Sequence, residues 1–203
     1  MWQDGSCLAY GRGDYPWKAS YAFDRDVDYC SGAFLSVRRS VWDELDGFDE
    51  RYAPAYYEDT DLCLRAWAAG HRVRYVAKAP VLHFEYGSSS PDSAAGMMAE
   101  RQALFARTHA DALGHHKPFS ERVRPAAVHH SVVRRVLLVD DRLPTDLMGA
   151  GSPRAAEVIE ALEDAVDLLT VLCLDPDSFS QEEARDWRQR HPTVELLVLG
   201  RDL

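Results

Sequence analysis

Residues 56–65 read Tyr-Tyr-Glu-Asp-Thr-Asp-Leu-Cys-Leu-Arg, and this stretch marks the point where an aromatic loop turns into a helix. Apolar residues at helical spacing predict a helix over 60–69, with Asp59 or Thr60 as its cap and Gly70 as its end. A helix N-terminus favours ionised carboxylates, so the three acidic side chains here suit a base or a cation ligand. The alternative is that acidic residues are simply common in first turns.

Composition limits the class of protein. The chain has 203 residues, of which 46% are hydrophobic, so it can build a real core. Its net charge of −10 repels nucleic acid, and we expect no nucleic-acid partner unless a basic face is segregated. The four cysteines form no C-x-x-C pair, which argues against a zinc knuckle and fits a reducing cytoplasm. No apolar run is long enough to span a bilayer.

The first part of the chain alternates loops with short elements. A strand is predicted over 28–37, where Gly32 indicates close approach by a ligand or another backbone. Ser40 is the expected cap of the next helix. The further elements expected are that helix over 40–47, strands over 72–76 and 81–84, and a helix over 91–113.

Residues 115–131 show no periodicity and are predicted to be a linker. The paired His129 and His130 are expected to be solvated, because no acidic residue or Cys lies at metal-ligand spacing beside them.

The pattern changes from residue 132 onward. A continuous apolar strand over 133–139, typical of a buried parallel sheet, precedes a helix ending at Leu162. A second buried strand follows over 167–174, then a helix with a Ser180 capping box, then a strand over 194–199. This β-α-β-α-β order predicts a parallel α/β sheet. We therefore expect domains over 1–114 and 132–203, with the second one truncated.

Several blocks of the first part occur in a recognisable order. They are RDVDYCSGA at 25–33, GFDERY at 47–52 and PAYYEDTDL at 54–62, followed by Arg65, Gly70, Tyr75, Val81 and His83. This order, over about residues 2–90, resembles the C-terminal half of a family 2 glycosyltransferase of the GT-A fold. It is most similar to members that build bacterial polysaccharides and lipopolysaccharides.

The resemblance implies inverting transfer of a sugar from a nucleotide sugar to an acceptor hydroxyl, with a base and a divalent cation, Mn²⁺ or Mg²⁺. It assigns the base to Asp59 beside Glu58, and the metal or diphosphate contact to His83. It assigns Asp61 and Arg65 to bracing the loop. The residues it places in substrate binding are Asp28, Ser31, Gly32, Ala33, Tyr57, Asp61 and Arg65.

The resemblance also implies partners. The acceptor is expected to be a glycan or lipid-linked glycan, and the chain to be cytoplasmic, able to work at the inner face of the membrane. The donor-binding N-terminal half, with its metal-binding D-x-D, is expected to belong to the same polypeptide and is absent from these residues. We therefore expect these 203 residues alone neither to bind donor well nor to turn over.

The second part resembles the opening of a GT-B, family 4-like glycosyltransferase domain. The residues that carry this resemblance are 136–140 (VLLVD), Pro144, 149–152 (GAGS) and Arg154. Two alternatives stay open. Asp140 and Asp141 look like the acidic pair of a phosphorylation receiver domain, although Asp175 follows the second strand and not the third. The chain could also be a non-catalytic carbohydrate-binding or scaffold module, with the aromatic residues of 2–23 as sugar platforms.

Overall fold

The structure is a computed structural model, and it describes residues 1–7, 13–83, 91–120, 129–145 and 151–202. The chain divides into two compact units. The first unit draws on residues 1–10, 26–75 and 80–130, and the second on 11–25, 76–79 and 131–203. Among the described residues, no helix combines the length and apolar character needed to cross a membrane.

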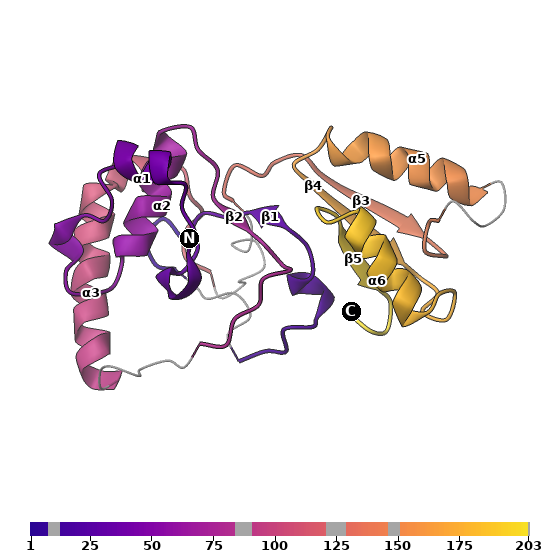
Figure 1. Cartoon of the computed structure of the whole chain (residues 1–203), viewed down its shortest axis with the longest axis horizontal. Coiled ribbons are helices and arrows are strands. Elements are labelled where there is room, and N and C mark those ends of the chain that lie inside the picture. The colour runs from indigo at the N-terminus through magenta and orange to yellow at the C-terminus, as the bar shows by residue number, and fades with distance from the viewer. Residues whose placement is uncertain (8–12, 84–90, 121–128, 146–150, 203) are drawn as a thin grey trace. The chain divides into compact units, whose positions relative to one another are not determined.

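The first unit is a set of short helices joined by loops (Figure 1). Its elements are η2 (Gly32–Phe34), α1 (Arg39–Glu44), η3 (Glu50–Tyr52), α2 (Glu58–Ala68), β2 (Arg74–Tyr75), α3 (Pro91–Thr108) and α4 (Ala110–Leu113). A short strand β1 (Arg25–Asp26) pairs with β2.

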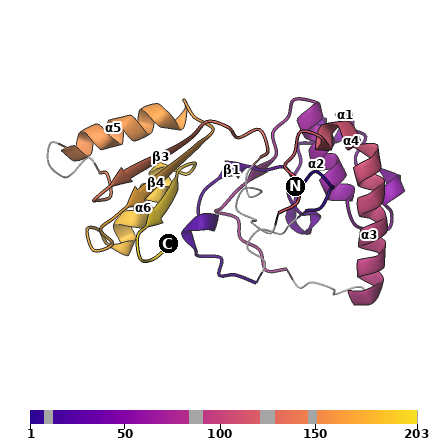
Figure 2. The same ribbon diagram turned by 180° about the vertical axis from the view of Figure 1, so that it is seen from behind.

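Helix α2 packs apolar residues on two sides. Leu64 joins a cluster with Tyr52, Phe105 and Leu113, which α3 and α4 help to build. Another cluster takes in Cys63 and Ala66 of α2, with Val27 and Val73 from flanking segments. Figures 1 and 2 show α2 and α3 side by side, as the shared cluster requires. Because α2 is fixed on both sides, its first turn is held in place.

The end of α2 is the one predicted from the sequence. Gly70 has a φ of +83°, a left-handed conformation that a residue without Cβ adopts readily. The Gly70 N–H donates to the Trp67 carbonyl at 3.0 Å, and the His71 N–H donates to the Ala66 carbonyl at 2.9 Å. These two bonds make a Schellman motif, which satisfies carbonyl groups that the helix leaves open.

Two predicted strands of the first unit are wrong. Residues 28–37 form an irregular segment containing the 3₁₀ turn η2, and residues 81–83 are not in a strand, while Phe84 lies outside the described residues. Ser40 is also not a cap, because α1 begins at Arg39 with Arg38 at the N-cap position. The alternating pattern at 28–37 arises because loop residues contact apolar clusters without pairing to a sheet.

The second unit is an α/β sandwich with the predicted parallel sheet. Its elements are η1 (Ala19–Tyr21), β3 (Arg135–Asp140), α5 (Gly151–Glu163), β4 (Leu168–Cys173), α6 (Gln181–Arg190) and β5 (Glu195–Val198). The strands lie in the order β3-β4-β5 and both pairs are parallel. Ser180 caps α6 as predicted, since its hydroxyl accepts from the Glu183 N–H and the Glu183 carboxylate accepts from the Ser180 N–H.

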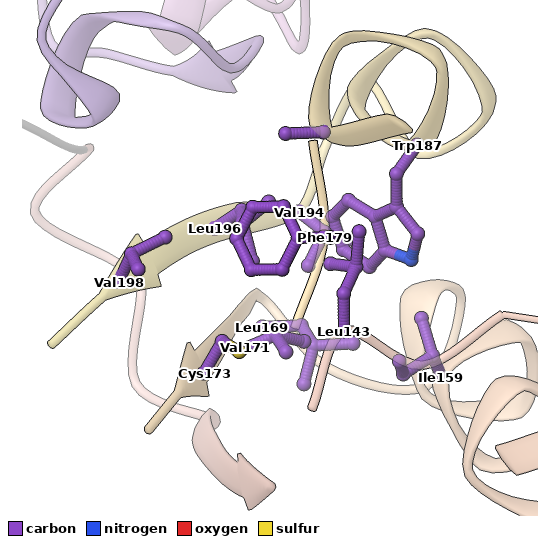
Figure 3. Packing of buried hydrophobic residues seen from close by; sticks show 11 residues of the cluster. Leu143, Ile159, Leu169, Val171, Cys173, Phe179, Trp187, Val194, Leu196 and Val198 are labelled. Atoms are coloured by element: carbon purple, nitrogen blue, oxygen red, sulfur yellow. The ribbon is translucent and has the colours of Figure 1, made fainter. Parts of the chain in front are cut away.

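One apolar core holds this unit together (Figure 3). Trp187 of α6 and Ile159 of α5, both with no exposed surface, point toward Val171 and Leu169 of the central strand. The buried members are Leu143, Ile159, Leu169, Val171, Cys173, Phe179, Ala184, Trp187, Val194, Leu196 and Val198. Both helices therefore share a single core on the sheet.

Strand β3 differs from its predicted burial. Leu137 is 58% exposed and Val139 is 52% exposed, whereas Val136 and Leu138 pack against the core. The prediction of a fully buried strand over 133–139 is wrong, because among the described residues the apolar core covers only one face of β3. A run of apolar residues does not reveal whether one face of a strand or both are covered.

Candidate functional site

Two left-handed residues lead the chain into the acidic stretch. Tyr56 has a φ of +75° and Tyr57 a φ of +72°, values that are costly for residues with a side chain. Tyr57 is the N-cap of α2 but provides no side-chain bond, so the predicted caps Asp59 and Thr60 lie inside the helix. Its hydroxyl donates to the Gly5 carbonyl at 3.0 Å, and its ring packs on Phe105. These contacts offset the backbone cost.

Asp59 reaches across to the η2 turn. Its Oδ2 accepts the Gly32 N–H at 2.6 Å, and its Oδ1 accepts the Thr60 N–H at 2.6 Å. A Cβ added to Gly32 would lie 3.3 Å from Asp59 Cβ, tighter than most such contacts. The close approach predicted at Gly32 is therefore made by a carboxylate side chain.

The turn that carries Gly32 is open to solvent. Ser31, Gly32 and Ala33 are all exposed, and the Ser31 hydroxyl accepts the Ala33 N–H at 3.3 Å. Asp59 itself is only partly buried. A carboxylate held by two backbone N–H groups beside an exposed turn has lone pairs left to accept a proton from a ligand.

Glu58 lies next to Asp59 in a different environment. Among the described residues, nothing hydrogen-bonds its buried Oε2 atom. Burial raises the pKa of Glu58, and the neighbouring charge of Asp59 raises it further. Two adjacent carboxyl groups with different surroundings are a common arrangement for proton transfer.

The Asp61 side chain is buried, and both of its carboxylate oxygens have partners. It is 1% exposed; its Oδ2 accepts from Arg65 Nε at 2.6 Å, and its Oδ1 lies 2.7 Å from His109 Nε2. Arg65 also donates to the Leu45 carbonyl at 2.6 Å and the Gly47 carbonyl at 2.8 Å. Asp61 and Arg65 thus tie the loop after α1 to α2.

A hollow of about 350 Å³ lies on that same loop, lined by Trp42, Asp43, Asp46, Gly47 and Phe48. None of the residues that the sequence assigns to catalysis or binding lines it. We therefore build the candidate site on the Asp59 carboxylate and the exposed η2 turn.

Asp28 lies in a buried cluster of histidines, and no hydrogen bond joins it to Asp59 among the described residues. It is 3% exposed, and its Oδ1 accepts the His130 N–H at 2.9 Å and lies 3.0 Å from His130 Nδ1. Its Oδ2 accepts from the Met1 amino group at 3.0 Å and lies 3.5 Å from His116 Nδ1. Burial alone would raise the pKa of Asp28, but bonds from His116 and His130 and the Met1 charge hold it well below its ordinary range.

The prediction that His129 and His130 are solvated is wrong. His129 is 6% exposed, its ring stacks on Trp67 at 3.7 Å between centroids, and its Nε2 lies 3.8 Å from Asp28 Oδ1. Their acidic partner lies about a hundred residues away in the sequence, so ligand spacing could not indicate it. Burial lowers the pKa of His129 to about 4.

His83 stands apart from these groups. It is exposed, and within the described part of the chain no hydrogen bond or ion pair is formed by its ring. The one described group of three potential ligands is Asp28, His129 and His130. A lone exposed imidazole offers a single ligand, so the described residues do not by themselves fit the divalent cation that the resemblance implies.

Sequence reasoning missed His109 and His116, the partners of Asp61 and Asp28. An acidic residue on the apolar stripe of a helix, as Asp61 is, signals a buried partner, because an ionised carboxylate is rarely buried alone. The signal does not say which distant residue supplies it.

Comparison with known proteins adds three findings. A family model described as Glycosyl transferase family group 2 matches residues 22–140, more than half of the chain. The chain is 38% identical over 96 residues to an N-acetylglucosaminyl-diphospho-decaprenol L-rhamnosyltransferase of Mycobacterium tuberculosis, covering 44% of this chain and 31% of that protein. It is 42% identical over 69 residues to the rhamnosyltransferase WbbL of Escherichia coli, covering 34% of this chain and 26% of that protein.

The chain therefore spans about a third or less of the length of these curated relatives. No solved structure matches the chain.

Proposed function

Because the chain belongs to glycosyl transferase family group 2, we propose that it is part of an enzyme that moves a sugar, with inversion, from a nucleotide-sugar donor to an acceptor hydroxyl. One observation carries the assignment of its site. The Gly32 and Thr60 N–H groups hold the Asp59 carboxylate in a fixed orientation beside an exposed turn.

Asp59 is the proposed base. The acceptor hydroxyl gives its proton to Asp59 while its oxygen bonds to the anomeric carbon of the donor. The bond from that carbon to the diphosphate oxygen breaks, and the nucleoside diphosphate leaves with the electron pair. The two N–H donors fix the carboxylate so that little reorganisation is needed during this step. Glu58, with its raised pKa, is the proposed neighbour that tunes Asp59.

The other residues fall into two groups. Ser31, Gly32 and Ala33 are exposed beside Asp59 and are proposed to contact the sugar or acceptor. Asp61 and Arg65 act from behind by fixing α2 and the loop after α1, and Tyr57 fixes the entry to α2. Asp28 is buried, so we propose that it shapes this region from inside.

The relatives suggest the substrates. Both are rhamnosyltransferases by name, and one acts on an N-acetylglucosaminyl-diphospho-decaprenol. We propose by this similarity a rhamnosyl donor and a lipid-linked glycan acceptor, in bacterial cell-surface polysaccharide synthesis. Work on a lipid-linked acceptor would bring the chain to the inner face of the membrane.

His83 remains the proposed contact to the cation or diphosphate, by family resemblance alone. We derive no step through a cation, because the described residues around His83 supply no second ligand. We also propose that the first unit belongs to a GT-A fold and the second begins a GT-B-like, Rossmann-type domain. The parallel β3-β4-β5 sheet supports the second assignment, while Gly149 and Ala150 lie outside the described residues.

The decisive experiment is Asp59→Asn in the protein that contains these residues. Transfer of labelled rhamnose from a nucleoside diphosphate to a lipid-linked acceptor should fall by about 10²–10⁴-fold, the usual contribution of a general base. The unfolding temperature should fall only slightly, because the Asn oxygen can still accept the Thr60 N–H and the exposed Gly32 N–H can bond to water instead.

Asp43→Asn is the matched control, since Asp43 is exposed and its ion-pair partner in the described part of the chain is the exposed Arg39 on α1. It should leave transfer unchanged. Retained transfer in Asp59→Asn would remove Asp59 from the role of base, and a loss of transfer that tracks a loss of stability would make its role structural.

A second candidate function is carbohydrate binding on an aromatic surface. Tyr15 and Trp17 are 60% and 74% exposed, and their rings stack at 4.8 Å between centroids. Trp2 and Phe23, by contrast, are buried, so only part of the aromatic segment is available. Oligosaccharide should change the tryptophan fluorescence of the wild-type chain, and Trp17→Ala should abolish that change. No response to oligosaccharide would exclude this function.

A further inference from the structure

The first unit contains a buried nest of imidazole rings around one carboxylate. The rings of His116 and His130 lie 4.0 Å apart between centroids, and those of His129 and His130 lie 4.2 Å apart. All three histidines have a ring nitrogen within 3.8 Å of Asp28. The nest therefore brings several imidazole nitrogens close to one carboxylate, and both kinds of group are common ligands of transition-metal ions.

The spacing of three atoms in this nest matches a metal site. Asp28 Oδ1 lies 3.0 Å from His130 Nδ1 and 3.8 Å from His129 Nε2, and each of the three residues offers a ligand atom within 4.8 Å of those of the other two. In a tetrahedral zinc site with bonds near 2.0–2.1 Å, ligand atoms are about 3.3 Å apart. The two distances from Asp28 Oδ1 lie on either side of that value, and small side-chain movements would bring the three ligand atoms around one ion.

We propose that Asp28, His129 and His130 bind a divalent transition-metal ion, with Zn²⁺ the best fit to two imidazoles and one carboxylate. Two nitrogen ligands and one oxygen suit Zn²⁺ better than Mg²⁺, which prefers six oxygens. The ion would crosslink two segments of the first unit, one containing Asp28 and the other residues 129–130. It is separate from any cation at a donor diphosphate, and it does not depend on sugar transfer.

The surroundings orient the proposed ligands. Trp67 stacks on His129 and fixes its ring plane. The second carboxylate oxygen of Asp28 is held by the Met1 amino group at 3.0 Å and faces His116 at 3.5 Å. Oδ1 accepts the His130 backbone N–H at 2.9 Å, and the ion would replace its contact to His130 Nδ1. Such outer contacts set ligand orientation in metal sites.

His116 is the adjacent fourth group. Its side chain is buried, and no described residue hydrogen-bonds its Nε2 atom. It lies beside the three proposed ligands and can support a water or donor group in the fourth coordination position, which zinc sites with three protein ligands commonly use.

The test uses the tag-free 203-residue chain after treatment with a chelator and dialysis. Isothermal titration with Zn²⁺ should show one ion bound per chain, and thermal unfolding should shift upward with Zn²⁺ but not with equimolar Mg²⁺, since a ligand of the folded state stabilises it. The variants are His129→Phe and His130→Phe, which keep an aromatic ring for stacking but remove the nitrogen ligands.

Each variant should bind Zn²⁺ at least about tenfold more weakly. The matched control is His71→Ala, because His71 is partly exposed, pairs with Glu44 and lies outside the nest. It should bind as the wild type does. Far-ultraviolet circular dichroism of each metal-free variant checks that it folds.

A second measurement needs no variant. Long-range ¹H–¹⁵N spectra of the wild-type chain should show the Nε2 signal of His129 and the Nδ1 signal of His130 shifting on addition of Zn²⁺, while the His71 signals stay in place. Zn²⁺ that leaves both signals unmoved, that binds the two Phe variants as tightly as the wild type, or that does not bind at all, would overturn the proposal.

Discussion

The two units of this chain are stabilised in different ways. The second unit has one apolar core of eleven buried residues between a parallel sheet and two helices. The first has two smaller apolar clusters and, between its segments, buried carboxylates paired with Arg, His and amino groups. An apolar core depends on volume and shape, whereas paired charges depend on protonation and on each partner being present. The first unit should therefore be the more sensitive to pH and to single charge changes.

The largest expected effect is in the second unit. Trp187→Ala removes a fully buried indole from the centre of the core and the Nε1 hydrogen bond to the Pro144 carbonyl. It should lower the free energy of unfolding by about 3–5 kcal/mol. Hydrogen exchange read by mass spectrometry should show faster exchange in β3, β4 and β5, with α2 and α3 unchanged. Equal loss of protection in both units would show that they unfold together.

Asp61→Asn tests the first unit in the same way. It leaves the Arg65 guanidinium without its carboxylate and weakens the contact to His109. We expect a loss of about 2–3 kcal/mol, because one partner of a buried pair is removed. Urea unfolding measures this loss, and Asp59→Asn, two residues away, should cost far less. Similar losses in the two variants would contradict the contrast between an engaged and an available carboxylate.

Mild acid should separate the units without a mutation. His129, faced by His116, His130, Asp26 and Asp28, keeps its ring neutral in the folded chain down to a pKa of about 4. The unfolded ring takes a proton near pH 6.5, so the unfolded chain binds more protons between these values. Stability of the first unit should therefore fall as the pH is lowered from about 6.5 to 4.

Asp28 adds to this effect at lower pH. Its pKa lies below the ordinary value, so its contribution is complete above about pH 4 and is lost as the pH falls further. In the second unit the pKa of Asp167 is lowered to about 2 by Arg134, so its effect also begins only below about pH 4. Metal-free chain studied by hydrogen exchange at pH 7 and pH 4.5 measures the difference, and His129→Phe should reduce it. Faster hydrogen exchange at pH 4.5 in the second unit than in the first would refute this prediction.

The smallest expected effect is at a helix cap. Ser180→Ala removes one half of the capping box of α6, at the surface of the second unit. It should cost about 1 kcal/mol. Thermal unfolding should detect a small drop, and Ser180→Thr should keep most of the stability, because the hydroxyl remains. A drop as large as that of Trp187→Ala would mean that the cap, and not the core, limits this unit.

The sequence predicted what depends on local pattern. The parallel pairing of β3, β4 and β5 was predicted from alternating strand and helix patterns, and the Ser180 capping box and the Gly70 helix end from neighbouring residues. Each is set by periodicity or by contacts within a few positions, which a single sequence displays directly.

The sequence did not predict contacts between residues that lie far apart in the chain. The histidines of Asp28 and Asp61 lie 102 and 48 residues away from them, and nothing in spacing connects such residues. The irregular path of 28–37 has the same origin, because Gly32 is placed by its bond to Asp59 and not by a strand neighbour. The sequence predicted a close approach to Gly32 by a ligand or another backbone, and the group that approaches it in the structure is the Asp59 side chain.

The left-handed backbone of Tyr56 has a consequence for anyone who engineers this chain. The contacts of Tyr57 with Phe105 and Gly5 offset its backbone cost, whereas the half-buried Tyr56 makes no comparable ring contact or hydrogen bond with the described residues. Tyr56→Gly would remove the free-energy cost of the left-handed backbone at position 56 and leave Glu58 and Asp59 unchanged. The same change would make the backbone before α2 more flexible. A substitution at position 56 that raises thermal stability would therefore hold the Asp59 carboxylate less firmly in its orientation.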